Sequence, residues 1–181
     1  MSKLCSAHFR EYRVSDLEAV LSLVHHTIDV SYSSVYPVRA IKFFKDFHSE
    51  AKIIERHQNG KILILEKDGK VIGTGSLVGS DILCVFVHPR LQYQGYGKAI
   101  MKELEKKAVL NAVSEVVLSV SLPSRRFYES LGYKITGSYS TDFGEGQQLN
   151  YWEAKKELRE EKPNACLPDT ELCLAKTGYS E

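Results

Sequence analysis

The sequence predicts a mixed α/β (α+β) fold, and three patterns along the chain indicate it. Residues 61–78 hold two strand-like runs on either side of Asp68-Gly69, the preferred centre of a two-residue hairpin. Residues 82–87 form a strand that is apolar on both faces, and a helical pattern and a further strand at 115–120 follow it. Residues 133–140 and 147–158 resemble a closing hairpin. These patterns predict antiparallel hairpins followed by a strand–helix–strand unit.

The first sixty residues are predicted to supply one strand and a helical region. Residues 8–13 alternate like an edge strand, and apolar residues recur at helical spacing over about 16–30. Ser15 followed by Glu18 predicts a capping box at the start of that helix. A second helical pattern ends at Asn59-Gly60, with a candidate break near residues 48–49.

The chain is expected to form one domain over residues 1–158, followed by an extension. Pro123 and Gly132 bracket a short helix before the closing hairpin. Residues 159–170 are polar and contain two prolines, which is typical of an extension beyond a folded domain. Within residues 159–181, the segment 171–176 could add one short strand.

Composition excludes several classes of partner. Lys and Arg number 24 against 23 Asp and Glu, so the net charge of +1 gives no argument for nucleic acid or a membrane surface. The longest apolar run is too short to cross a bilayer, and the N-terminus lacks the apolar core of a signal peptide. The scattered cysteines are Cys5, Cys84, Cys166 and Cys173. They indicate reduced thiols in a cytoplasmic protein, with no disulfide framework and no metal site.

Two glycines, Gly95 and Gly97, lie between the apolar strand and the following helix. Glycine is the default residue of tight turns, so this segment has a purely structural interpretation. The functional interpretation is a phosphate cradle, because bare amides at a helix N-terminus point N–H donors and a positive dipole end at an anion. Both interpretations are open at this level.

Neither common nucleotide motif fits this segment. A P-loop requires glycine at position 92, which is Gln92, and serine or threonine at position 99, which is Ala99. The dinucleotide fingerprint requires a small residue at Ile100 and an acidic residue closing the next strand, but Glu115 precedes that strand. A different phosphate-bearing ligand is therefore needed.

Residues 92–97, QYQGYG, after the VHP of 87–89, resemble the acyl-CoA-binding motif of the GNAT superfamily of N-acetyltransferases. Residues 121–133, SLPSRRFYESLGY, resemble the second signature of that superfamily, and residues 149–158 resemble its closing strand. The resemblance covers residues 8–158. It implies a GNAT-like mixed, mostly antiparallel central sheet of about six to seven strands flanked by about four helices.

The resemblance also implies a binding site for acetyl-CoA as co-substrate. The amides that would hold its pyrophosphate belong to Gln92, Tyr93, Gln94, Gly95, Tyr96, Gly97 and Lys98. The Lys98 side chain is either a direct phosphate contact or a solvated helix lysine. The pantetheine arm would pair with the backbone of Val85, Phe86 and Val87 on a bulged strand. Ser121 stands where the family often has an asparagine that holds this arm.

Tyr128 matches the family tyrosine that protonates the leaving thiolate. A phenol with a pKa of about 10 is close enough to a thiol of about 8.5 for efficient proton transfer. The structural alternative is a tyrosine that only packs on the core. No general base is identified, because the strand 82–87 holds no carboxylate. Asp81 precedes this strand, His88 follows it, and a water relay would need neither.

The resulting hypothesis is an N-acetyltransferase that moves acetyl from acetyl-CoA to a primary amine by direct attack. Cys84 lies in a buried strand, so a covalent acyl-enzyme is not expected. The alternative is a non-catalytic acyl-CoA-binding regulatory module. On the acceptor side, His25, His26, Tyr32 and Tyr36 either line a pocket or, for the histidines, cap a helix end. A homodimer through sheet edges is a further hypothesis.

Overall fold

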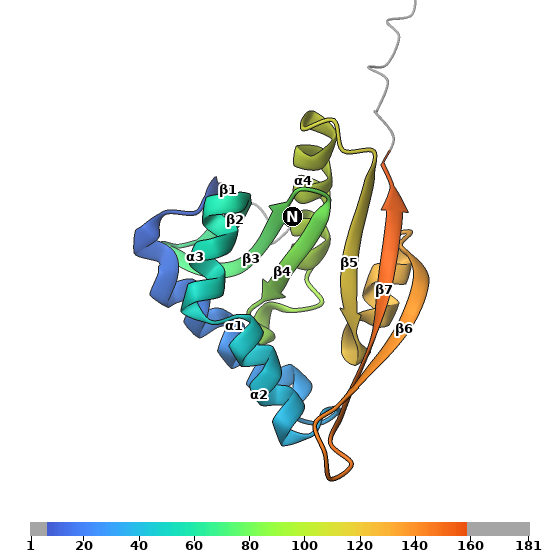
Figure 1. The fold of residues 1–181 in the computed structure, drawn as a ribbon. Helices are drawn as coiled ribbons and strands as arrows, with labels where there is room; N and C mark the ends of the chain where they lie inside the picture. The colour runs from blue at the N-terminus through green and yellow to red at the C-terminus, as the bar shows by residue number, and fades with distance from the viewer. Residues whose placement is uncertain (1–6, 159–181) are drawn as a thin grey trace, which may run out of the picture.

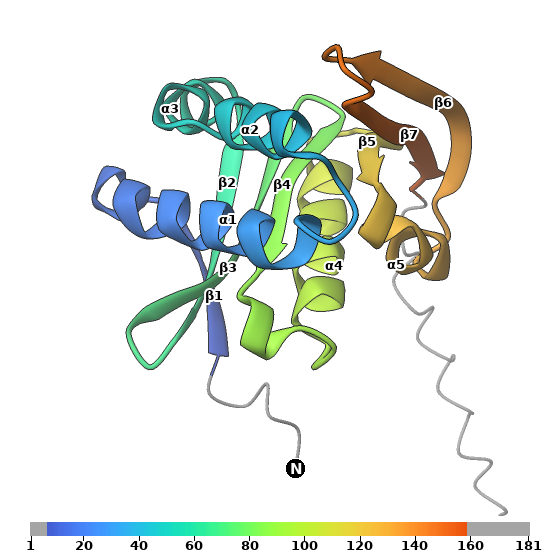
Figure 2. The same cartoon turned by 90° about the horizontal axis from the view of Figure 1, so that it is seen from below.

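The structure, a computed structural model, describes residues 7–158 and arranges them as one sheet between two layers of helices (Figures 1 and 2). The elements in chain order are β1 (Ala7–Glu11), α1 (Leu17–Tyr32), α2 (Val38–Phe47), α3 (Glu50–Asn59), β2 (Lys61–Lys67), β3 (Lys70–Val78), β4 (Asp81–Val87), α4 (Tyr96–Leu110), β5 (Glu115–Ser121), α5 (Arg125–Ser130), β6 (Lys134–Asp142) and β7 (Gln148–Glu157). The predicted fold class is confirmed.

The sheet has seven strands in the order β1-β2-β3-β4-β5-β7-β6. Every neighbouring pair is antiparallel except β4 and β5, which are parallel and share one registered pair, Asp81 with Val117. Beyond that pair the two strands diverge, as Figure 1 shows. The centre of the sheet is therefore open on one edge of β4, at the end where this strand stops.

A bulge in β4 accompanies this divergence. Thr74 of β3 pairs with Phe86 and Ser76 pairs with Leu83, so two β4 residues face one β3 residue between these pairs. Cys84 lies in the bulge with a φ of 56°, which is unusual for a residue with a side chain. The bulge that the family resemblance implied is present, and it bends β4 at the point where β5 leaves it.

Apolar side chains form separate cores on the two faces of the sheet. Ile100, Met101 and Leu104 of α4 pack with Leu63 and other sheet residues on one face. On the other face, α1 and α3 pack on alternate residues of the same strands. Side chains of β2 point alternately to the two faces, and both faces are covered by helices. Both sets of side chains are therefore apolar, and the strand sequence is a continuous apolar run.

The helical region before β2 forms two helices, and the candidate break near residues 48–49 is confirmed. It breaks between His48, the C-cap of α2, and Ser49, the N-cap of α3 in extended conformation. The described residues therefore form five α-helices, one more than the approximate four expected. The Asp68-Gly69 turn is confirmed, with φ of 51° and 71°.

The predicted Ser15–Glu18 capping box is not formed. A short 3₁₀ turn, Val14–Asp16, precedes α1 and places Asp16 at the N-cap position. The Asp16 carboxylate accepts a 2.7 Å hydrogen bond from the Arg13 amide and two from Arg10. Asp16 thus combines a local bond to the Arg13 amide with an ion pair to the first strand, and the Ser15–Glu18 spacing reveals neither.

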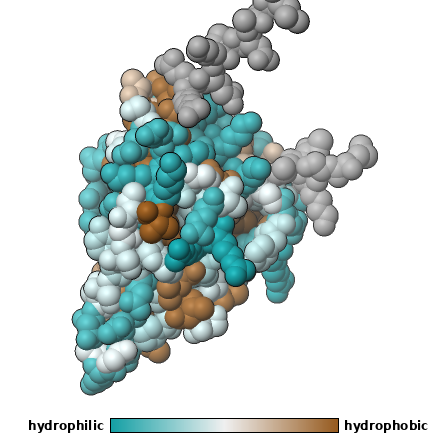
Figure 3. Space-filling view, turned by 90° about the vertical axis from the view of Figure 1, so that its right-hand side faces the viewer, coloured by the Kyte–Doolittle hydropathy of each residue, from teal (hydrophilic) through white to brown (hydrophobic). Residues whose placement is uncertain are grey.

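The closing hairpin leaves β6 as an edge strand, and most of its residues are exposed. Figure 3 views the molecule from this side and shows mostly hydrophilic residues with smaller hydrophobic patches. The proposed strand at 171–176 and three of the cysteines lie outside the described residues. No helix within residues 7–158 has the length and apolar character to cross a bilayer.

Candidate active site

The N-terminus of α4 is uncapped. Gly95 is the N-cap residue with a φ of 89°, and it has no side chain to accept from the helix amides. The first intrahelical bond of α4 runs from the Ala99 amide to the Gly95 carbonyl. The amides of Gly97 and Lys98 precede this bond and so find no acceptor within the helix, and the first turn contains no acidic residue. An anion is the complementary group for this end of the helix.

Several side chains of the glycine segment serve the protein itself. Gln92 donates to the Val87 carbonyl at 3.2 Å and to Ser31 Oγ at 3.4 Å, which ties the loop to β4 and α1. Gln94 donates to the Arg90 carbonyl, and Tyr96 is buried in the core. Tyr93 and Lys98 point into solvent. What the segment offers a ligand is mainly its backbone, with the Lys98 ammonium as a nearby charge.

Gly97 allows α5 to approach α4 closely. A Cβ atom at this position would lie 3.2 Å from Cζ of Phe127 and 3.9 Å from a Val87 methyl. The N-terminus of α4, the end of β4 and the start of α5 thus meet at one place. The two sequence motifs, thirty residues apart in the chain, are adjacent in the structure.

A cavity of about 200 Å³ opens where β4 and β5 separate. The open edge of β4 forms one wall, with Val85 and Phe86 among its lining residues. Val87, the third strand residue predicted to contact the arm, is buried toward α4 and does not line it. Because β5 does not pair with this part of β4, the strand edge is free to bind an extended ligand.

Tyr128 of α5 lines the same cavity. Its side chain is buried, and its ring packs against Phe127 at 5.0 Å and Tyr133 at 5.8 Å between centroids. Burial raises the pKa of the Tyr128 phenol, with smaller contributions from Tyr32 and Cys84. The phenol therefore stays protonated at neutral pH and can act as a proton donor.

Ser121 joins this wall to the acceptor side. Its hydroxyl donates to the Tyr32 hydroxyl at 3.0 Å and also contacts Ser124 Oγ. Tyr36 reaches the same turn differently, because its hydroxyl accepts from the Leu122 amide at 2.7 Å and donates to the Asn150 carbonyl at 2.9 Å. Tyr32 lines the cavity, whereas Tyr36 holds its walls together.

The histidines of α1 do not line the cavity. His25 Nε2 lies 3.2 Å from the carbonyl oxygens of both Lys45 and His48, so it caps the end of α2. His26 packs against His88 at 5.5 Å between ring centroids. Both histidines lie within α1 and not at its end, so only His25 acts as a cap, and it caps α2; His26 makes a ring contact instead.

None of the described residues that line the cavity is a carboxylate. Asp81 is exposed at the far end of β4, and His88 at the near end accepts from the Arg90 amide. Burial raises the pKa of the Cys84 thiol to about 11, which makes it a poor nucleophile. The cavity therefore supplies a proton donor and no evident base or nucleophile.

The cavity wall opposite β4 is not indicated by any pattern in the sequence. Phe43, Phe44 and Phe47 of α2 line the cavity together with His48, and Leu149 and Tyr151 of β7 face them. Phe43 also packs against Phe143 in the loop after β6, at 5.5 Å between centroids. The spacing of the phenylalanines marks one helix face, but nothing local indicates that this face meets the closing hairpin.

A family model described as an acetyltransferase (GNAT) domain matches residues 28–144, which is more than half of the chain. The chain belongs to this GNAT family. The match includes the glycine segment, the bulged strand and Tyr128. A comparison with curated proteins finds no match.

Solved structures share the GNAT fold at low sequence identity. A GCN5-related N-acetyltransferase from Rhodopseudomonas palustris superposes with a TM-score of 0.76 at 21% identity, over 84% of this chain and 96% of that one. PaiA N-acetyltransferase from Thermoplasma acidophilum, in complex with coenzyme A, gives 0.67 at 22%, over 84% and 99%. YncA from Salmonella typhimurium, with acetyl-CoA, gives 0.65 at 21%, over 89% and 99%. These likenesses establish the fold.

Proposed function

We propose that this protein transfers an acetyl group from acetyl-CoA to a primary amine. The observation that carries the proposal is the separation of β4 and β5, which leaves a cavity lined by the free edge of β4 and by Tyr128. The N-terminus of α4, with no side-chain cap, follows the end of this strand. A ligand with phosphates at one end and an extended, amide-containing arm at the other matches this arrangement. Acetyl-CoA has that construction.

In this proposal each part of the ligand has a partner in the chain. The pyrophosphate binds the amides of residues 92–98, and the pantetheine arm adds to the free edge of β4 near Val85 and Phe86. Ser121 supports the arm at the end of β5. The thioester then lies beside Tyr128 in the cavity.

The proposed chemistry is direct attack by the neutral amine on the thioester carbonyl carbon. A carbon–nitrogen bond forms, and the carbonyl oxygen becomes an oxyanion that a β4 amide can stabilise. The carbon–sulfur bond then breaks, and the thiolate takes the Tyr128 phenol proton. The nitrogen loses its proton to water, since none of the described residues that line the cavity is a carboxylate. The Tyr128 phenolate then regains a proton from solvent.

Thermal unfolding with acetyl-CoA, CoA and NAD, each alone, tests the binding half of the proposal. A ligand that binds only the folded state stabilises it, by about 2.7 kcal/mol at a hundred times its Kd. We expect a shift with acetyl-CoA and CoA and none with NAD. No shift with any of the three ligands would mean that the glycine segment is only a turn.

The second candidate is a non-catalytic acyl-CoA-binding regulatory module, and the absence of a carboxylate from the cavity wall favours it. Thiol release from acetyl-CoA with a broad panel of amines separates the two. Amine-dependent release above the rate of hydrolysis supports the transferase. Tight CoA binding with no release for any amine supports the module.

A further inference from the structure

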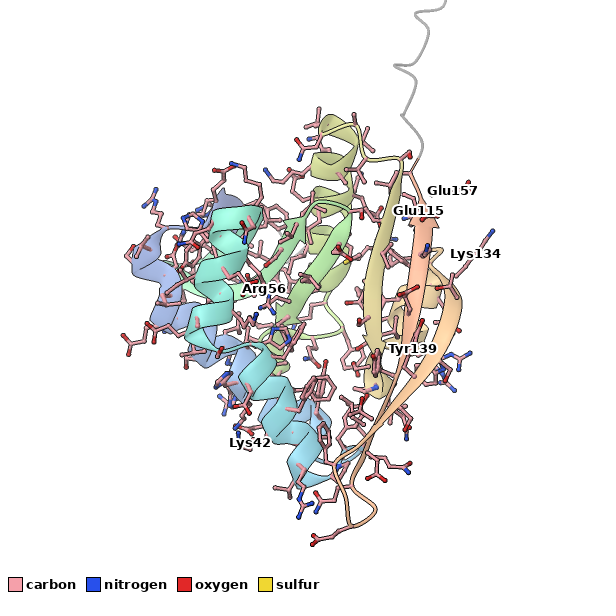
Figure 4. The ribbon with its side chains drawn as sticks, in the orientation of Figure 1. Lys42, Arg56, Glu115, Lys134, Tyr139 and Glu157 are labelled. Carbon is pink, nitrogen blue, oxygen red and sulfur yellow. The ribbon has the colours of Figure 1, made fainter. Side chains whose placement is uncertain are left out.

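The buried cation Arg56 lies behind the cavity wall formed by α2 and His48. Arg56 of α3 is 6% exposed, and Figure 4 shows its side chain running from α3 toward β4. Its guanidinium donates to the Phe47 carbonyl at 2.7 Å and lies 5.1 Å from the Phe47 ring. Within residues 7–158 it forms no ion pair with an acidic side chain. The exposed Glu55 interacts with Arg56 through space but pairs with Lys52. A ligand carboxylate would therefore add the closer counter-ion that a buried charge favours.

Arg56 fixes the protonation of the histidine beside it. Its Nη1 lies 3.1 Å from His48 Nδ1, and a guanidinium carries only donors. Nδ1 must therefore accept, which places the histidine proton on Nε2. Burial, Arg56 and His25 lower the pKa of His48 to about 3, so the ring is neutral and is no candidate for a general base.

The His48 ring is part of the cavity wall, which leaves its Nε2–H group as a donor for a ligand there. The ring lines the cavity, packs edge-on against Phe86 at 5.1 Å and is 6% exposed. Nε2 makes no hydrogen bond to another described residue. Nε2 also keeps some accessible surface. Within residues 7–158, the one fully buried side-chain nitrogen or oxygen atom without a hydrogen-bond partner is Ser76 Oγ. An oriented donor, backed by a positive charge, is thus presented to the acceptor.

We propose that the acceptor amine also carries a carboxylate, which accepts a hydrogen bond from His48 Nε2 and supplies the close counter-ion that Arg56 lacks. The inference rests on the proposed function and names its substrate class, an amino acid with an apolar or aromatic body. Phe43, Phe44 and Phe47 provide the matching apolar wall. The CoA phosphates are assigned to the α4 N-terminus, so they do not compete for this donor.

The test is calorimetric titration of CoA-saturated protein with matched ligands: phenylalanine, leucine and their carboxamides. A hydrogen bond to a charged group predicts that each free acid binds about tenfold or more tightly than its amide. His48→Phe, which keeps a ring against Phe86 but removes the donor, should abolish the difference. Arg56→Met should reduce it, and Arg56→Lys should retain part of it.

The control is His57→Phe, because His57 follows Arg56 in α3 but contacts Tyr12 instead of the cavity. This variant should keep the preference for acids, and every variant used must bind CoA as the wild type does. Equal binding of acids and amides, no binding of either, or an unchanged ratio in His48→Phe would overturn the inference. The proposed function fails separately, if bound acetyl-CoA releases no thiol with any amine.

Discussion

At the scale of single residues, environment decides the role of each titratable group in the cavity. Tyr128 and Cys84 are both buried, and burial raises the pKa of each because it disfavours the anion. A raised pKa keeps a proton donor protonated, whereas it keeps a nucleophilic thiol from forming the reactive thiolate. Residue type alone makes Tyr128 a candidate proton donor and Cys84 a candidate nucleophile. Their burial in the structure is compatible only with the first role.

Tyr128→Phe should lower kcat by about a hundredfold or more, because general acid catalysis contributes roughly 10²–10⁴ to rate. The Kd for CoA should be nearly unchanged, since the ring contacts remain. Stopped-flow thiol release and calorimetry measure the two quantities. Tyr133→Phe is a suitable comparison, because its hydroxyl donates to Glu105 outside the cavity. An unchanged kcat in Tyr128→Phe would remove this residue from the mechanism.

At the scale of elements, the glycine segment depends on backbone conformation more than on side chains. Gly95 has a positive φ with open space around its missing Cβ, and so has Gly69 in the distant β2–β3 turn. The two positions carry similar strain for alanine but differ in what lies nearby. They form a natural pair for separating a folding role from a binding role.

Gly95→Ala and Gly69→Ala should each cost about 1–2 kcal/mol of unfolding free energy, because both place a side chain in the left-handed region. Only Gly95→Ala should weaken CoA binding, by disturbing the amides at the start of α4. Urea unfolding and calorimetry give the two readouts. Weaker CoA binding in Gly69→Ala would mean that strain acts through general stability and not through the cradle.

The start of α1 makes a prediction about acid stability. The hydrogen bond from Arg10 lowers the pKa of Asp16, so its contribution is complete above the unfolded pKa and is lost as pH falls through the lower folded value. Asp16→Asn should therefore destabilise the protein by about 1–3 kcal/mol at neutral pH. Denaturant unfolding should show this penalty shrinking below about pH 4.

Glu55→Gln is the control for Asp16→Asn, because Glu55 is exposed and pairs with Lys52 on the surface of α3. Its unfolding free energy should follow the wild-type curve closely at every pH. A penalty for Asp16→Asn that stays constant down to the most acidic point would contradict the ion-pair explanation.

At the scale of the whole molecule, the layers bring segments from all parts of the chain to one cavity. The bulged β4 comes from the middle, α2 from the first third, and α5 and β7 from the end. None of these elements contributes a carboxylate to the wall. In the proposed reaction, the amine would therefore lose its proton to solvent.

The pH dependence of kcat/KM tests this. It should rise with the fraction of neutral amine and level off near the pKa of the amine used, about 10 for a lysine-like amine. A second amine with a lower pKa should move the inflection with it, and no falling limb is expected below the raised pKa of Tyr128. An inflection at one fixed pH for both amines would indicate a base supplied by the protein.

The homodimer hypothesis also belongs to this scale. The free edge of β6 offers unpaired backbone groups, although its exposed surface is mostly hydrophilic (Figure 3). Sedimentation equilibrium over a range of micromolar concentrations would find a dimer mass if sheet edges pair. A monomer mass throughout would end the hypothesis.

The sequence by itself determined the element order, the Asp68-Gly69 hairpin, the glycine segment and the position of Tyr128. Each of these features depends on residues close together in the chain, so hydrophobic periodicity and turn-forming residues are enough to predict it. Only the tertiary structure decided the Asp16 ion pair, the aromatic wall of α2 and the Arg56–His48 pair. Those depend on which helix face meets which strand, and contacts between distant segments leave no local pattern. The acceptor side of the site is therefore where the fold adds most to the sequence.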